Sequence, residues 1–364
     1  MRITANQVTI ARLVGMPFVA ALAYGDEQLR IVAVILGTLI GLTDTVDGYL
    51  ARKYGVTVLG SLLDPVADKV FTVVCYGVCA DMGIIPWWVA AAILARELGV
   101  TVLRSSLELR GRRLPSTNAA KAKTWVQMLG IGFVVLSPIF GKRGNLELLF
   151  GVPLGAALLT MLILRLTPRR RFRPIEFAAT VLIGFLAAAV LGGPPVTRVT
   201  VLAFVIAMTW YSALDYIVVG FRELVRPDSF RGLHWARLVA GFALPIVAMV
   251  ALGTTRLPTT PLIILLSVDM ARGALDNYAA NRRVVDFSWG ASLWAEIALL
   301  GGALVIAPIG TVLTMFAAAL GVIETLRALV RYLRAPAATD APRAVPLAKP
   351  PLTRQPEADP GLRV

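Results

Sequence analysis

Runs of about 20 mostly apolar residues recur along this chain, and each is long enough to cross the ~30 Å hydrocarbon layer of a membrane as an α-helix. Hydrophobic residues make up 57% of the 364 residues and charged residues only 16%, and the mean hydropathy is +0.74. This composition is typical of a polytopic helical membrane protein. We therefore predict an all-α membrane protein with about twelve transmembrane helices. The expected helices lie at about 7–24, 30–50, 64–83, 86–108, 122–140, 146–165, 176–193, 197–221, 234–253, 258–280, 288–307 and 309–333.

The positive charge of the chain is placed unevenly between these runs. A net charge of +14 would by itself be compatible with nucleic-acid binding. Most lysines and arginines, however, fall in alternate loops and in the C-terminal tail, and the remaining loops hold only Arg30, Lys142, Arg143, Arg198 and Arg256. This bias follows the positive-inside rule. We therefore predict a multi-pass protein of the cell (inner) membrane with both termini in the cytoplasm, in contact with membrane lipid and without a nucleic-acid partner.

Four aspartates interrupt the apolar pattern in the stretch LTDTVDGYLARKYGVTVLGSLLDPVADK, residues 42–69. Asp44 and Asp47 are three residues apart, and so share one face of a helix. Asp64 and Asp68 are four residues apart and share a face in the same way. Carboxylates in or near hydrocarbon must be neutralised, and their oxygens suit hard divalent cations. We therefore predict a site for two Mg²⁺ or Mn²⁺ ions, the arrangement used for displacement at phosphorus.

Small residues and one arginine accompany the aspartates. Gly48, Ala51 and Gly60 leave room for a ligand or a facing backbone to approach closely. Arg52 supplies a permanent cation that suits a diphosphate. The aspartate spacing does not match an EF-hand loop, and the sequence contains no P-loop.

Together these residues resemble the signature of the CDP-alcohol phosphatidyltransferase family, which reads D-x2-D-G-x2-A-R and then G-x3-D-x3-D. All fixed positions of that signature are present, namely Asp44, Asp47, Gly48, Ala51, Arg52, Gly60, Asp64 and Asp68. Members of the family are integral membrane enzymes that displace CMP from a CDP-linked lipid with the hydroxyl of a second alcohol. The resemblance therefore implies a phosphotransferase of phospholipid biosynthesis.

Further segments are similar to the phosphatidylglycerophosphate synthases within that family. They are ANQVTIARLVGMP at 5–17, ARELGVTVLR at 95–104, AKAKTWVQM at 120–128 and WYSALDYI at 210–217. This similarity implies transfer of the phosphatidyl group from CDP-diacylglycerol to glycerol 3-phosphate, which forms phosphatidylglycerophosphate. Inositol phosphate or phosphatidylglycerol as the acceptor stays open, and so does a membrane transporter or scaffold.

The resemblance also implies a role for each site residue. Asp68 would be the general base, and the metals would be held by Asp44, Asp47, Asp64 and Asp68. The CMP part of the lipid donor would be bound by Gly48, Ala51, Arg52, Gly60 and Ser61. A phosphorylated acceptor needs cations, for which the candidates are Arg96, Arg104, Arg110, Lys121 and Lys123. Arg96 would lie inside a span, where an arginine usually has a function, whereas ordinary positive-inside charge explains Arg110.

Composition and the resemblance together divide the chain into three parts. Residues 1–225 would form the CDP-alcohol phosphatidyltransferase domain, with a helical insertion at 141–195. Residues 226–334 would form a second transmembrane domain. The Pro/Ala-rich segment 335–364 is predicted to be a disordered cytoplasmic tail.

The second transmembrane domain is predicted to be a degenerate repeat of the first. ARLV at 11–14 recurs at 236–239, and Asp47 aligns with Asp276. The other three aspartates have no acidic counterpart in that alignment, so the second copy would lack the metal site. The repeat is compatible with a homodimer or with an intrachain pseudo-dimer. Asp269 and Arg272, which are three residues apart, are predicted to form a structural ion pair.

Overall fold

The computed structural model describes residues 5–54, 58–113, 118–142, 144–166, 173–225, 231–255, 257–281, 288–334 and 345–346. These parts of the chain are almost entirely helical, as predicted. The α-helices are α1 (Ala5–Ala23), α2 (Glu27–Tyr54), α3 (Val58–Asp81), α4 (Trp87–Leu109), α5 (Asn118–Lys142), α6 (Leu146–Leu166), α7 (Arg173–Val225), α8 (Arg231–Thr254), α9 (Thr259–Asn281), α10 (Ser288–Val305) and α11 (Gly310–Arg334). A 3₁₀ turn, η1 (Ala307–Ile309), precedes α11, and the two-residue strands β1 (Arg112–Arg113) and β2 (Val345–Pro346) pair in parallel. Apart from β2, the predicted tail at 335–364 lies outside the described residues.

A helix lies at each of the twelve predicted ranges, although two of these ranges belong to one element. The long helix α7 contains both 176–193 and 197–221 and is interrupted at Gly193, where φ is 63° and ψ is −163°. Only glycine adopts this conformation readily, and two prolines follow it, so the helical hydrogen bonding is broken there.

Six of the described helices are long and apolar enough to cross a membrane, namely α1, α5, α6, α7, α8 and α11. These helices fit an all-α membrane protein. The larger number of about twelve crossings remains a prediction.

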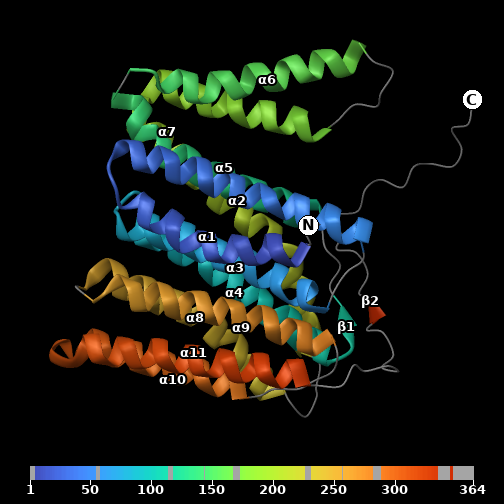
Figure 1. Cartoon of the computed structure of the whole chain (residues 1–364), viewed down its shortest axis with the longest axis vertical. Helices are drawn as coiled ribbons and strands as arrows, with labels where there is room; N and C mark the ends of the chain where they lie inside the picture. The colour runs from blue at the N-terminus through green and yellow to red at the C-terminus, as the bar shows by residue number, and fades with distance from the viewer. Residues whose placement is uncertain are drawn as a thin grey trace, which may run out of the picture.

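The helices lie side by side and form a stack whose long axis runs across them (Figure 1). Helix α6 lies at one end of the stack, α10 and α11 lie at the other, and α3 and α4 lie between. Helix α4 contacts α3, α7, α8 and α9, and most of its residues from Val89 to Glu108 are buried. A helix that is apolar on nearly every side is expected at such a central position.

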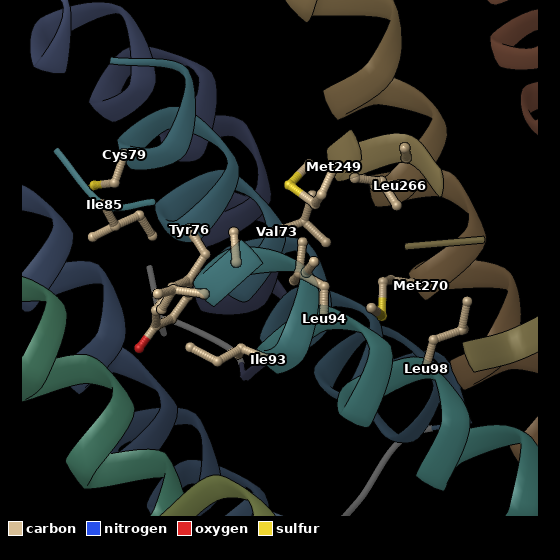
Figure 2. Close-up of a cluster of buried hydrophobic side chains, with 14 of the residues drawn as sticks. Val73, Tyr76, Cys79, Ile85, Ile93, Leu94, Leu98, Met249, Leu266 and Met270 are labelled. Atoms are coloured by element: carbon tan, nitrogen blue, oxygen red, sulfur yellow. The ribbon is translucent and has the colours of Figure 1, made fainter. Parts of the chain in front are cut away.

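The main hydrophobic core joins the first and second halves of the chain. Figure 2 shows Val73 of α3 and Leu94 of α4 close to Met249 and Leu266, which come from α8 and α9. All four side chains are fully buried. Small residues allow the backbones of α4 and α8 to approach closely. At one such place, a Cβ atom on Gly241 would lie only 3.8 Å from the Cα atom of Gly99. Helices from both sides of the predicted domain boundary near residue 225 therefore share one hydrophobic core.

Candidate functional site

Helices α2 and α3 carry the four aspartates in the register that the sequence predicts. Asp44 and Asp47 lie in the last part of α2, and Asp64 and Asp68 lie in the first part of α3. The side chains of Asp44, Asp47, Ala51, Arg52 and Ser61 lie outside the described part of the structure, as does the link 55–57. Gly60 is buried in the first turn of α3.

Two side chains of α1 reach the two described aspartates. Thr9 donates a hydrogen bond from Oγ1 to Asp64 Oδ1 at 2.7 Å, and Arg12 donates from Nη1 to Asp68 Oδ1 at 2.8 Å. Thr9 and Arg12 are buried, whereas 54% of the Asp68 side chain is exposed. Arg12 therefore neutralises part of the charge of Asp68 and leaves its carboxylate accessible.

The donor chemistry of these carboxylates fits a hard divalent cation. Asp64 and Asp68 place oxygen ligands on one face of α3, and neither side chain is fully buried. Among the side chains that the structure describes, no three His, Cys, Asp or Glu residues form a group that could hold a metal. The full set of four metal ligands, which includes Asp44 and Asp47, therefore remains a prediction.

A polar cavity of about 220 Å³ opens beside Asp68. Three cationic side chains line it, namely Arg12 of α1, Lys69 of α3 and Lys123 of α5. Its other polar lining residues are Thr72, Tyr76, Glu97, Thr124 and Gln127. The cavity thus brings three cations together with the accessible carboxylate of Asp68 and the buried carboxylate of Glu97. This arrangement suits an anionic molecule bearing a hydroxyl group.

A buried network centred on Glu97 holds one wall of this cavity. Glu97 Oε1 accepts hydrogen bonds from Lys123 Nζ at 2.6 Å, from Arg96 Nη1 at 3.2 Å and from Gln127 Nε2 at 3.4 Å. Arg96 also donates to the Thr209 carbonyl at 3.2 Å and to Ser212 Oγ at 2.9 Å, both on α7. The network therefore ties α4, α5 and α7 together and fixes the Lys123 ammonium at the cavity wall.

Lys69 is fixed from another direction. Its Nζ donates to Thr101 Oγ1 at 2.5 Å, and Thr101 in turn donates to the Glu97 carbonyl at 2.7 Å. The hydrogen-bond partner of Lys69 is therefore a neutral hydroxyl rather than a carboxylate, and Lys69 also lines the cavity.

Of the four predicted acceptor-binding cations whose side chains the structure describes, Lys123 alone lines this cavity. Arg96 lies behind it and contacts Glu97. Arg104 and Arg110 contact α7 instead, since the Arg104 guanidinium carbon lies 4.5 Å from the centre of the Tyr216 ring and Arg110 Nη1 donates to the Glu223 carbonyl at 2.6 Å. The side chain of Lys121 lies outside the described residues.

Lys69 and Arg12 are cavity cations that the sequence alone did not assign to the acceptor. A signal was present for both. Lys69 directly follows the predicted base, and Arg12 interrupts the first apolar run, where an arginine usually has a function.

An apolar cavity of about 300 Å³ adjoins the polar one. It lies among α1, α2, α3 and α5, and both cavities are lined by Phe71, Cys75, Met128 and Ile131. Trp125 and Leu129 of α5 line it and are each 51% exposed, so this cavity borders the lipid-facing surface of the bundle. Its lining suits a hydrocarbon chain whose polar end lies in the cavity beside Asp68.

Sequence comparisons find known proteins that are similar to the first part of the chain. The family model for CDP-alcohol phosphatidyltransferase matches residues 2–166, which contain all four aspartates. A probable phosphatidylglycerophosphate synthase of Mycobacterium tuberculosis is 43% identical over 142 residues, which are 38% of this chain and 67% of that protein. A CDP-diacylglycerol–glycerol-3-phosphate 3-phosphatidyltransferase of Rickettsia bellii is 37% identical over 145 residues, which are 38% and 76% of the two chains.

A relative whose name states a different activity is also similar. The CMP-forming cardiolipin synthase of Streptomyces coelicolor is 32% identical over 152 residues, which are 40% of this chain and 71% of that protein. No solved structure is significantly similar to the chain. The matched region ends at residue 166, inside the segment 141–195 that was expected to be an insertion, so the limits of the domains remain a prediction.

Proposed function

We propose that this chain, which belongs to the CDP-alcohol phosphatidyltransferase family, transfers the phosphatidyl group of CDP-diacylglycerol to glycerol 3-phosphate and releases CMP. The chain is a membrane enzyme of phospholipid synthesis. The observation that carries the choice of acceptor is the polar cavity that Arg12, Lys69 and Lys123 line together with Asp68. A small phosphorylated alcohol has the anionic group and the hydroxyl that such a cavity can bind.

The proposed reaction is a displacement at the β-phosphorus of CDP-diacylglycerol. A hydroxyl oxygen of the acceptor forms a bond to that phosphorus, and the bond from the phosphorus to the oxygen of CMP breaks. Asp68 takes the proton of the hydroxyl as general base, since its carboxylate is accessible and lies at the cavity. Divalent cations held by Asp44, Asp47, Asp64 and Asp68 would stabilise the charge that develops on the phosphate oxygens.

The acceptor phosphate is assigned to the cavity cations. Arg12, Lys69 and Lys123 donate charge-assisted hydrogen bonds to its oxygens. Arg96 acts through Glu97, which positions Lys123. We assign Arg104, Arg110 and Lys121 to the general attraction of anions to the basic cytoplasmic surface, which requires no direct contact.

The lipid donor is assigned to the region between α2 and α5. One acyl chain would occupy the apolar cavity, which adjoins the polar one through Phe71, Cys75, Met128 and Ile131. The CMP group would be bound by Gly48, Ala51, Arg52, Gly60 and Ser61. This arrangement would place the diphosphate next to the predicted metal ligands of α2 and α3.

The proposed location is the cell (inner) membrane, with both termini and the catalytic end of the bundle in the cytoplasm. The loop that holds β1 lies at the end of the bundle where α1 begins (Figure 1), and this loop is one of the basic ones. CMP-linked lipid and glycerol 3-phosphate would therefore meet at the basic face.

The test is release of CMP by the purified protein in detergent with CDP-diacylglycerol and Mg²⁺ or Mn²⁺. Glycerol 3-phosphate, inositol phosphate and phosphatidylglycerol are offered separately, the last because of the cardiolipin synthase relative. We expect release only with glycerol 3-phosphate, complete loss of it with EDTA, and a loss of about 10²–10⁴-fold in Asp68→Asn. Release with another acceptor alone would overturn the proposed substrate, and an unchanged rate in Asp68→Asn would overturn the base.

A further inference from the structure

Helices α8 and α9 lie directly against α3 and α4, two of the helices that line the polar cavity. Helix α8 packs on α4, and α9 packs on both α3 and α4. Figure 2 shows side chains of these elements meeting in one core, with Leu98 of α4 close to Met270 of α9. The second half of the chain therefore forms the wall behind the catalytic helices.

Buried ion pairs hold α9 in a single position within that wall. Arg237 of α8 donates to Asp276 of α9 at 2.5 Å, and Arg272 of α9 donates to Glu296 of α10 at 3.3 Å. Arg272 also donates to Asp269 at 2.7 Å, which confirms the predicted ion pair. Each of these side chains is at most 3% exposed, and those of Asp269 and Glu296 are completely buried. Because breaking a buried pair leaves an uncompensated charge, these pairs restrict sliding or rotation of α9.

Helix α9 touches the residue that positions Lys69. A Cβ atom on Gly273 of α9 would lie 3.1 Å from Leu98 Cδ1, 3.3 Å from Trp289 Cη2 and 3.4 Å from Thr101 Cγ2. The other branch of Thr101, its Oγ1, is the acceptor for Lys69 Nζ. A displacement of Thr101 by α9 would therefore move the Lys69 ammonium in the cavity.

The same half also contacts α3 beside the aspartates. Leu62 and Val66 of α3 pack in one cluster with Leu275 of α9 and Tyr332 of α11. Leu62 and Val66 each lie two residues from Asp64 in sequence, so this cluster supports the turn of α3 that carries the carboxylates.

We propose that α9 is a positioning element for the acceptor site, and that Gly273 sets the place of Lys69 through Thr101. The proposal rests on the proposed function, because it assigns the acceptor phosphate to the cavity that Lys69 lines. It gives the second half of the chain a role in catalysis although that half lacks the aspartate quartet. Thr101 and Gly273 act through Lys69 and touch no reacting atom.

The test compares two glycines that are equally crowded. In Gly273→Ala the new methyl group meets Leu98, Trp289 and Thr101 at 3.1, 3.3 and 3.4 Å, and two of these residues belong to α4. In Gly321→Ala it meets Val268 and Leu265 at 3.0 and 3.1 Å, within the second half itself. We expect Gly273→Ala to raise the KM for glycerol 3-phosphate roughly three- to tenfold and to leave the KM for CDP-diacylglycerol unchanged. Gly321→Ala should lower the melting temperature about as much as Gly273→Ala does, but it should leave both KM values unchanged.

A rescue variant separates positioning from damage to the fold. Thr101→Ser keeps the hydroxyl that accepts the hydrogen bond from Lys69. It removes the methyl group that the new side chain of Gly273→Ala would contact. Adding it to Gly273→Ala should return the KM for glycerol 3-phosphate to within about twofold of the wild-type value. Equal effects of the two glycine variants, or a rise in both KM values without rescue, would overturn the proposal.

The two proposals fail separately in this design. If the wild-type protein uses a different acceptor, the proposed substrate is wrong and the same comparison is made with that acceptor. Binding of glycerol 3-phosphate, followed as a rise in melting temperature, gives the comparison without turnover. Equal affinity in wild type and Gly273→Ala would then overturn the positioning role.

Discussion

Neighbouring residues of α3 divide the work of the site between them. Asp68 is paired with Arg12 and stays accessible, and the next residue, Lys69, is held by the hydroxyl of Thr101. Both line the polar cavity, although they are adjacent in the helix. A carboxylate to take a proton and an ammonium to hold a phosphate are thus placed by consecutive positions, each with its own partner from another helix.

Replacing Lys69 should weaken binding of the acceptor selectively. Lys69→Met keeps the length of the side chain and removes a charge-assisted hydrogen bond of about 1.5–3 kcal/mol, so the KM for glycerol 3-phosphate should rise roughly 10- to 100-fold. The KM for CDP-diacylglycerol should change little. Steady-state kinetics with each substrate varied in turn measures both values, with Lys142→Met at the far end of α5 as the control. An equal rise for both substrates would contradict the assignment.

Glu97 is the residue whose loss should cost most stability. Its carboxylate is buried and shared by Lys123, Arg96 and Gln127. Glu97→Gln leaves the two cations uncompensated in the core, which costs about 3–5 kcal/mol. Thermal unfolding in detergent should show a clearly lower midpoint, whereas Glu147→Gln on the exposed face of α6 should leave it unchanged. A wild-type midpoint in Glu97→Gln would refute the role of this network.

Among the elements, α7 depends on a single interruption to pack against several helices, chiefly α4, α5 and α6. Its first part packs near α6, and its second part supplies Thr209 and Ser212 to the network behind the cavity. The change of direction occurs at Gly193 with its positive φ, followed by Pro194 and Pro195. An unbroken helix of 53 residues would be ~80 Å long, far more than a bilayer needs, so the interruption is required for both parts to fit in one membrane.

Replacing Gly193 by alanine should lower the free energy of unfolding, although there is room for the methyl group. No atom lies within 4 Å of the Cβ position of Gly193, so the cost of Gly193→Ala is the backbone strain alone, about 1–3 kcal/mol. Gly184→Ala in the same helix has equally free space but helical geometry, and should be neutral or slightly stabilising. Thermal unfolding of the two variants checks this. The expectation would be wrong if both variants shifted the midpoint alike.

At the scale of the whole molecule, the second half covers apolar surface of α3 and α4 in the first half. Helix α4 is buried on the sides that face α8 and α9, and its backbone lies close to that of α8 at Gly99 and Gly241. These contacts are compatible with the intrachain pseudo-dimer that the faint repeat suggests. In both ARLV copies the arginine pairs with an aspartate of a later helix, Arg12 with Asp68 and Arg237 with Asp276, although these two aspartates are not aligned in the repeat.

The two halves should therefore associate when they are made as separate chains. We expect residues 1–227 and 228–364, co-expressed, to purify together and to release CMP, because the core between α3, α4, α8 and α9 forms without the covalent link. Gly99→Leu in the first chain should prevent co-purification, since Phe242 already lies 2.3 Å from the position of a Cβ atom there. A first half that purifies alone as an active homodimer would contradict the prediction.

The sequence by itself determined the features that depend on local spacing and composition. Apolar runs of membrane length predicted where the helices lie, and intervals of three and four residues placed each aspartate pair on one helix face. The pairing of Asp269 with Arg272 followed from the same short-range geometry. The eight signature positions indicated the family without any knowledge of the fold.

Only the tertiary structure decided which distant side chains meet. Arg12 and Lys69 reach the cavity because α1 and α3 pack together, whereas Arg104 and Arg110 turn to α7, and no spacing along the chain separates these cases. Thr101 became important because it lies between Lys69 and Gly273, which are far apart in sequence. Contacts of this kind depend on how helices pack against one another, and helix packing is set by the fit of whole surfaces rather than by any local pattern.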